Sequence, residues 1–101
     1  MLVAFSVSTA GSDNGYVHEA VAAAVRVVRD SGLPNHTDAM FTTIEGTWDE
    51  CMSVVKRAVD AVTPYGPRVG LVLKADIFGD RTGELTGKLE RLETVLEQPG
   101  A

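Results

Sequence analysis

The stretch Asn35–Glu50, with the sequence NHTDAMFTTIEGTWDE, decides the fold. Its threonines, Phe41 and Ile44 favour two short extended segments, at about residues 35–40 and about residues 42–46. The residues that follow, TWDE, have the form of a capping box, in which the Thr47 side chain accepts from the Glu50 N–H and the Glu50 side chain reaches back. The stretch therefore predicts two strands followed directly by a helix.

The residues before this stretch predict a strand and a helix. Residues 1–8 alternate between two faces, with Val3, Phe5 and Val7 on one and Ala4, Ser6 and Ser8 on the other. A helix is expected to start near Tyr16, with an apolar stripe made of Val17, Val21, Ala24, Val25 and Val28. The sequence SGLP at residues 31–34 ends it, because Gly32 suits the left-handed position after a helix and Pro34 cannot continue one.

The residues after the stretch predict a helix, a strand and a second helix. The apolar stripe of the first is formed by Trp48, Met52, Val55, Val59 and Val62. A long strand is expected at Val69–Phe78, and a C-terminal helix at about residues 84–98 carries Leu85, Leu89, Leu92 and Leu96. The order β-α-β-β-α-β with an extra C-terminal helix predicts a single α+β domain over residues 1–101 with a ferredoxin-like sandwich. In that fold two helices cover one sheet face and the other face is left bare.

The amino-acid composition limits the classes of partner that the protein can bind. The 101 residues include 9 Lys and Arg against 14 Asp and Glu, and the resulting net charge of −5 repels a phosphate backbone. The single cysteine, Cys51, excludes an intramolecular disulfide, and no zinc-type spacing accompanies it. The apolar N-terminal run fits neither a signal peptide nor a membrane span. We expect a cytoplasmic protein with no nucleic-acid or membrane partner, no metal and no cofactor.

The bare sheet face carries the candidate site. If Ile44 faces the helices, Thr43 and Glu45 face the bare side and meet side chains of the neighbouring strands, namely Ser6, Ser8 and Lys74. Two interpretations stay open. Glu45 and Lys74 form a cross-strand ion pair covered by oligomerisation, or the Glu45 carboxylate accepts hydrogen bonds from a ligand amine inside a polar pocket.

Little in the sequence points to catalysis. His18 and His36 have no evident carboxylate or serine partner, and Cys51 is predicted to be a packing or surface residue rather than a nucleophile. We therefore predict a non-enzymatic binding protein. The alternatives are a dimeric α+β-barrel enzyme on the same topology and a purely structural assembly module. We expect a homo-oligomer, because contacts with a second copy would bury the bare sheet face and the leucine stripe of the C-terminal helix.

Seven short motifs also resemble the small, YkoF-related thiamine-binding protein family. They are MLVAFSVS at Met1–Ser8, AVRVVRDSGLP at Ala24–Pro34, M-x-T-T-I-E-G at Met40–Gly46, WDECM at Trp48–Met52, VKR at Val55–Arg57, PRV at Pro67–Val69 and R-T-G-x-L-x-G-K at Arg81–Lys88. The resemblance runs from Met1 to about Glu93.

The resemblance implies a ferredoxin-like fold, assembly through the open sheet faces into dimers and commonly tetramers, and binding of thiamine or its hydroxymethylpyrimidine portion. It implies no catalytic reaction. Carried over by position, its residues are Glu45, Ser6, Ser8, Met40 and Lys74, and Thr43 adds a hydroxyl beside Glu45. The chain departs from the family at residues 39–41, where Ala-Met-Phe replaces the usual Pro-Met-Gly, so the turn loses its glycine and gains a ring.

Overall fold

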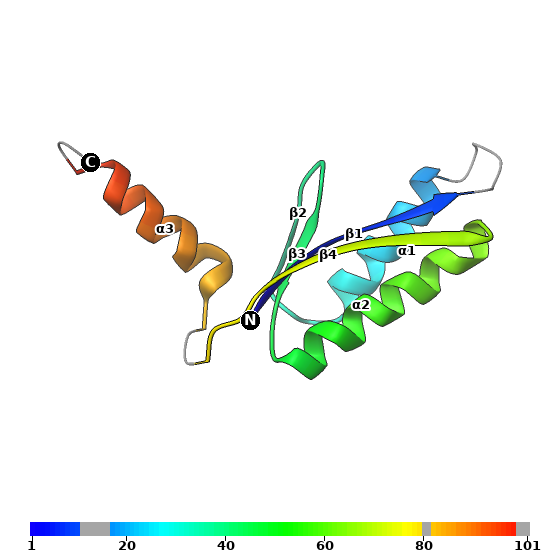
Figure 1. Cartoon of the computed structure of the whole chain (residues 1–101), viewed down its shortest axis with the longest axis horizontal. Helices are drawn as coiled ribbons and strands as arrows, with labels where there is room; N and C mark the ends of the chain where they lie inside the picture. Colours follow the sequence, from blue (N-terminus) through cyan, green and yellow to red (C-terminus); the bar gives the residue numbers. More distant parts are fainter. Residues whose placement is uncertain (11–16, 80–81, 99–101) are drawn as a thin grey trace.

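The computed structural model describes residues 1–10, 17–79 and 82–98. Its elements follow the order β1 (Leu2–Ala10), α1 (Val17–Asp30), β2 (Asn35–Thr37), β3 (Thr42–Glu45), α2 (Trp48–Val62), the 3₁₀ turn η2 (Thr63–Tyr65), β4 (Arg68–Asp76) and α3 (Glu84–Leu96) (Figure 1). The four strands form one antiparallel sheet in the order β2-β3-β1-β4. The predicted ferredoxin-like α+β fold is confirmed, with the extra helix at the C-terminus.

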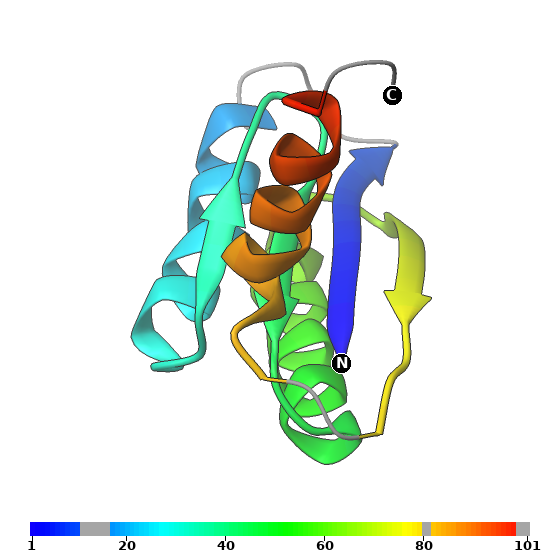
Figure 2. The same ribbon diagram turned by 90° about the vertical axis from the view of Figure 1, so that its left-hand side faces the viewer.

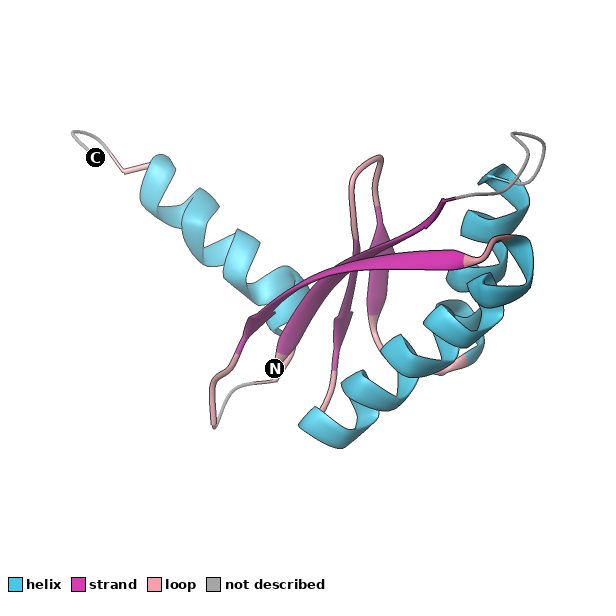
Figure 3. Cartoon of the chain, turned by 45° about the vertical axis from the view of Figure 1, so that its right-hand side comes forward, coloured by secondary structure: helices cyan, strands magenta, loops and turns pink. Residues whose placement is uncertain are grey.

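The helices divide between the two sides of the sheet. Helices α1 and α2 cover one face, and α3 projects outward from the other face, which is otherwise open (Figure 3). The overall dimensions of 53 × 29 × 19 Å reflect this projection. The predicted start of the first helix near Tyr16 lies outside the described residues. In the part of the chain that the structure describes, we find no helix with the length and apolar character that crossing a membrane requires.

The core lies between the sheet and α1 and α2. Val3, Phe5 and Ile44 point into it and are almost completely buried, which confirms the predicted strand parity. The helices supply the other buried residues, namely Ala20, Ala24, Val28, Cys51, Val54, Val55, Ala58 and Val62. Burial also raises the pKa of the Cys51 thiol, and this agrees with its predicted packing role.

Both predicted helix stripes were partly wrong. Val21 on α1 is 47% exposed, while Ala20, one position earlier, is buried with Ala24. Trp48 on α2 is 56% exposed because it lies in the first turn, beside a groove at the end of the sheet. The cause is that α1 and α2 pack against each other as well as against the sheet, so the buried stripe of each helix is turned toward its neighbour.

The capping box at the start of α2 is confirmed. The Thr47 hydroxyl accepts from the Glu50 N–H at 3.2 Å, and the Thr47 N–H donates to Glu50 Oε1 at 2.9 Å. The hydrogen bond from the Thr47 N–H to the carboxylate, and after it the Thr47 side chain, lower the pKa of the Glu50 carboxyl. This cap separates β3 from α2 within two residues, as the sequence predicted.

Strand lengths are unequal across the sheet. β1 and β4 each have 9 residues, whereas β2 has 3 and β3 has 4. The β1 and β3 pairing ends at Phe5 opposite Thr42, but the β1 and β4 pairing continues to Ala10 opposite Arg68. The far half of the molecule is therefore a two-stranded ribbon lying on α1 and α2, with no third strand beside it among the described residues.

Candidate functional site

Asp38 builds the turn between β2 and β3. Its Oδ1 accepts the Met40 N–H at 2.8 Å and the Phe41 N–H at 2.9 Å, while its own N–H donates to the Phe41 carbonyl at 2.9 Å. No described residue of this turn has a positive φ. Hydrogen bonds to the Asp38 side chain therefore stabilise the turn, whereas tighter hairpins rely on a glycine with positive φ. The hydrogen bonds from Phe41 and then Met40 lower the pKa of the Asp38 carboxyl.

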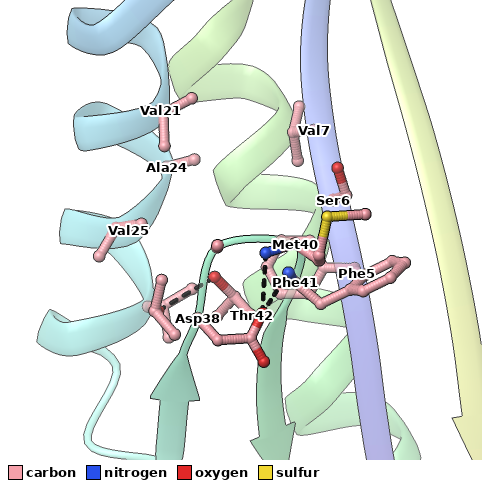
Figure 4. Close-up of a pocket in the computed structure, with 13 residues that line it drawn as sticks. Phe5, Ser6, Val7, Val21, Ala24, Val25, Asp38, Met40, Phe41 and Thr42 are labelled. Carbon is pink, nitrogen blue, oxygen red and sulfur yellow. Dashed lines mark hydrogen bonds between the residues drawn. The ribbon is translucent and has the colours of Figure 1, made fainter.

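A cavity of about 160 Å³ lies between this hairpin and α1 (Figure 4). We name it the hairpin cavity. It is lined by Val21, Ala24, Val25 and Val28 from α1, by Phe5, Ser6 and Val7 from β1, and by residues 37–42 of the hairpin. It exists because β3 begins only at Thr42, so the part of α1 beyond that point faces an open space instead of a strand.

The polar groups of the hairpin cavity come mainly from the hairpin. The hydroxyls of Thr37 and Thr42 lie 3.1 Å apart and form a hydrogen bond, and Thr42 is only 8% exposed. Asp38 lies at the rim, where Oδ1 holds the turn and Oδ2 has no hydrogen-bond partner among the described residues. Past Phe5, the edge of β1 that faces away from β4 has no described strand partner, so backbone donors and acceptors border the cavity as well.

The residues that the sequence singled out on the open face do lie there. They are spread over four rows, a row being a set of residues paired side by side across the strands. Thr43, Ala4 and Lys74 lie side by side across three strands. Glu45 lies one row away, opposite Leu2, whereas Ser6 and Ser8 lie in the other direction along β1, opposite Val72 and Gly70. Ser6 lies four positions beyond Leu2, or about 13 Å along the strand. The expected meeting of Glu45 with the two serines is therefore wrong, and Thr43 is its nearest hydroxyl neighbour on this face.

Glu45 instead holds the start of α3. Its side chain is 7% exposed, and Oε1 accepts the Leu85 N–H at 2.9 Å. Gly83, the N-cap residue of α3, offers no side chain, so the glutamate of β3 takes the place of an N-cap acceptor. The alternative interpretation, an ion pair between Glu45 and Lys74, is also wrong, because β1 lies between their strands and Lys74 has no salt bridge to any described residue.

A second cavity, of about 500 Å³, lies between the open face and the first turns of α3. We name it the open-face cleft. Thr43 and Leu2 form part of its floor, and Leu85 and Leu89 form part of its wall. Ion pairs flank it: Arg91 donates two hydrogen bonds to the buried Glu84 carboxylate. On the other side Lys88 pairs with Asp76, and this hydrogen bond lowers the pKa of the Asp76 carboxyl.

Two of the six predicted residues line the hairpin cavity, namely Ser6 and Met40, and Met40 is 74% exposed at its mouth. Thr43 lines the open-face cleft, and Glu45 lines a groove of about 410 Å³ at the end of the sheet. Sequence reasoning missed Asp38 and Thr37. An aspartate two residues before the turn apex is an Asx-turn signal, and that signal could have identified Asp38.

Comparisons with known proteins agree with this architecture. Residues 3–93 match the family described as thiamine-binding protein. The chain belongs to this family. It is similar to UPF0045 protein Mb1933 of Mycobacterium bovis, with 54% identity over 100 residues, covering 98% of this chain and 97% of that protein. It is also 35% identical over 82 residues to UPF0045 protein sll0230 of Synechocystis, covering 80% of this chain and 68% of that protein.

Two solved structures have the same fold as this family member. Protein MJ1052 of Methanocaldococcus jannascii aligns with a TM-score of 0.81 and 28% identity, covering 91% of this chain and 94% of that one. TM0486 of Thermotoga maritima aligns with a TM-score of 0.73 and 26% identity, covering 89% of this chain and 97% of that one. The name of TM0486 assigns it provisionally to thiamine biosynthesis or salvage.

Proposed function

We propose that this chain binds thiamine, or its hydroxymethylpyrimidine part, reversibly and without chemical conversion, as a homo-oligomer. Membership of the thiamine-binding protein family and the likeness to TM0486 support the ligand class. The net charge of −5 favours a ligand that carries a cationic thiazolium ring. The exposed leucines of α3 and the open sheet face support self-association.

The hairpin cavity is the proposed site of the pyrimidine ring. At about 160 Å³ it is smaller than the 300 Å³ or more typical of pockets that enclose a whole drug-sized ligand, so it suits one ring, with the thiazolium outside near Met40. Phe5 and the valines of α1 provide apolar contact for the ring faces. Asp38, Thr42 and the unpaired edge of β1 offer donors and acceptors along the ring edge, which buried polar edges require.

The observation that carries this proposal is the unpartnered Oδ2 of Asp38 at the cavity rim. The lowered pKa of Asp38, caused by the backbone N–H groups of Phe41 and Met40, keeps its carboxylate ionised at neutral pH. An ionised carboxylate accepts a strong hydrogen bond from an aminopyrimidine amine.

The sharpest test is Asp38→Asn, measured by titration calorimetry with thiamine and with hydroxymethylpyrimidine. Asparagine keeps the acceptor oxygen that the turn needs and removes the charge. Because the variant loses a charge-assisted hydrogen bond to the ligand, we expect its affinity to be roughly 10- to 150-fold weaker. Asp30→Asn at the exposed end of α1 is the matched control and should leave the affinity unchanged.

Other outcomes would overturn the proposal at different levels. If Thr43→Val weakens binding while Asp38→Asn does not, the ligand lies in the open-face cleft and the hairpin cavity is the wrong site. If the wild-type chain binds neither compound at millimolar concentration, the ligand class itself is wrong. Light scattering that finds a particle of 10.7 kDa at micromolar concentration would refute the homo-oligomer.

A further inference from the structure

One side chain carries the charge of the hairpin cavity. Among the described residues that line it, Asp38 is the charged one, and the others are apolar or carry hydroxyl groups. The hairpin that bears Asp38 lies between α1 and β1 (Figure 2). Arg26 and Arg29 of α1 are exposed and are not lining residues. Within the described part of the chain, the cavity therefore presents a negative charge and no basic side chain to a ligand.

The turn holds this charge in place. Asp38 Oδ1 accepts the Met40 N–H at 2.8 Å and the Phe41 N–H at 2.9 Å. Rotating the carboxylate away from the rim would break both hydrogen bonds and leave the turn without its acceptor. The hydrogen bonds from Phe41 and then Met40 also lower the pKa of the Asp38 carboxyl. A ligand in the cavity therefore meets a fixed negative charge.

We infer that Asp38 makes the hairpin cavity select the free alcohol form of its ligand and disfavour the phosphate esters of the same compounds. The inference rests on the proposed function, because it concerns thiamine and hydroxymethylpyrimidine. Each of these compounds has a primary hydroxyl group, and phosphorylation of that group adds about two negative charges. The ester phosphate gains no basic partner from the lining and is repelled by the carboxylate, most strongly where water is excluded.

The penalty depends on how close the phosphate comes to Asp38. In hydroxymethylpyrimidine the amino and hydroxymethyl groups are on adjacent ring carbons, so an amine bound by Asp38 brings the ester phosphate close to the same carboxylate. Because the cavity of about 160 Å³ has room for one ring, this phosphate would also lose part of its hydration. In thiamine the hydroxyl group belongs to the thiazolium part, which lies outside near Met40, where water and salt weaken the repulsion.

Titration calorimetry tests the selection with hydroxymethylpyrimidine, its monophosphate, thiamine and thiamine monophosphate. In the wild-type protein, the ratio of ester to alcohol dissociation constants should be about 100 or more for the pyrimidine and about 10 for thiamine. Asp38→Asn keeps the acceptor of the turn and removes the charge, so both ratios should fall toward 1, roughly. Added salt should lower the wild-type ratios as well. Asp30→Asn, at the exposed end of α1, is the control and should keep them.

An added cation gives the converse test. Ala39 lines the cavity and is exposed, so Ala39→Lys places an ammonium group at its rim. This variant should bind both esters about tenfold more tightly than the wild-type protein. Ala39→Gln has a long side chain without charge and should show no such gain. Circular dichroism checks that each variant is folded.

Failure of the selection and failure of the proposed function give different results. If none of the four compounds binds at millimolar concentration, the ligand class is wrong and the selection falls with it. If alcohols and esters bind equally well, or if Asp38→Asn keeps the wild-type ratios, the selection by Asp38 is wrong while the proposed function stands. Tighter binding of the esters that Arg29→Gln abolishes would place the phosphate on α1 and also overturn the selection.

Discussion

Replacing Glu45 by alanine should release α3 from the sheet. The change removes the acceptor of the Leu85 N–H, a 2.9 Å hydrogen bond in a site where Glu45 is 7% exposed. A helix N-terminus that loses its acceptor is destabilised by about 0.5 to 2 kcal/mol, and a hydrogen bond to a carboxylate contributes about 1.5 to 3 kcal/mol. We take about 1 to 2 kcal/mol for the local effect, which is a factor of about 5 to 30 in the equilibrium for detaching α3.

Few other contacts hold α3, and the effect should therefore stay local. The ion pair of Lys88 with Asp76 has both side chains well exposed, and exposed pairs contribute about 0 to 1 kcal/mol. Leu85 is half-buried, but Leu89, Leu92 and Leu96 are more than half exposed. The core between the sheet and α2 does not depend on this contact.

Hydrogen exchange read by mass spectrometry measures the opening directly. Amides of residues 88–96 should exchange about 5 to 30 times faster in Glu45→Ala, while amides of α2 keep their protection. Glu45→Gln keeps an acceptor oxygen and should show a smaller change, and Lys88→Gln, which removes the exposed ion pair, should show almost none. Unchanged exchange over α3 in Glu45→Ala would refute the capping role and return the carboxylate to the list of ligand-anchor candidates.

Three further predictions concern stability. Ile44→Ala, at a fully buried position, should lower the free energy of unfolding by about 2 to 5 kcal/mol in a denaturant titration, and a loss below about 1 kcal/mol would contradict its place in the core. Thr47→Ala removes the capping-box hydroxyl and should lower it by about 1 kcal/mol, whereas an unchanged midpoint would argue against the cap. Hydrogen bonds from neighbouring groups lower the pKa values of Asp38, Glu50 and Asp76, so the unfolded chain takes up protons at higher pH than the folded chain. The contribution of these three carboxyls to the free energy of unfolding should therefore be constant between about pH 5 and pH 7 and fall as the pH drops toward 3, and titrations over that range that show no fall would contradict it.

The fold could be predicted from the sequence because its signals are local. Alternation placed Val3 and Phe5 in the core, and the TWDE box fixed the start of α2 to the residue. The parity of β3 was also right, since Ile44 is buried and Thr43 and Glu45 lie on the other face. Each of these features depends on residues within a few positions of one another, and such short-range rules are reliable.

The arrangement of the site could not be predicted, because it depends on the register between strands and on the path of the loop that leads to α3. Parity says which face Glu45 occupies but not which residue lies opposite it, because the register that pairs Glu45 with Leu2 joins two strands that are far apart in the sequence. The position of α3 depends on how residues 77–83 turn back, and no local pattern records that Leu85 ends beside Glu45. The Glu45 side chain, which was predicted to bind a ligand, thus already forms a hydrogen bond within the chain.

One structural feature underlies both proposals. Because Asp38 ends β2 after 3 residues, the hairpin is too short to accompany β1, and the space left beside α1 is the hairpin cavity. The same shortness leaves β1 and β4 as a two-stranded ribbon, a form that is marginally stable without further strands or packing. Packing on α1 and α2 supports one side of that ribbon. Asp38 has a second effect, because it is the one charged residue among the described residues that line the cavity. The same side chain therefore determines both the space and the charge that a ligand meets.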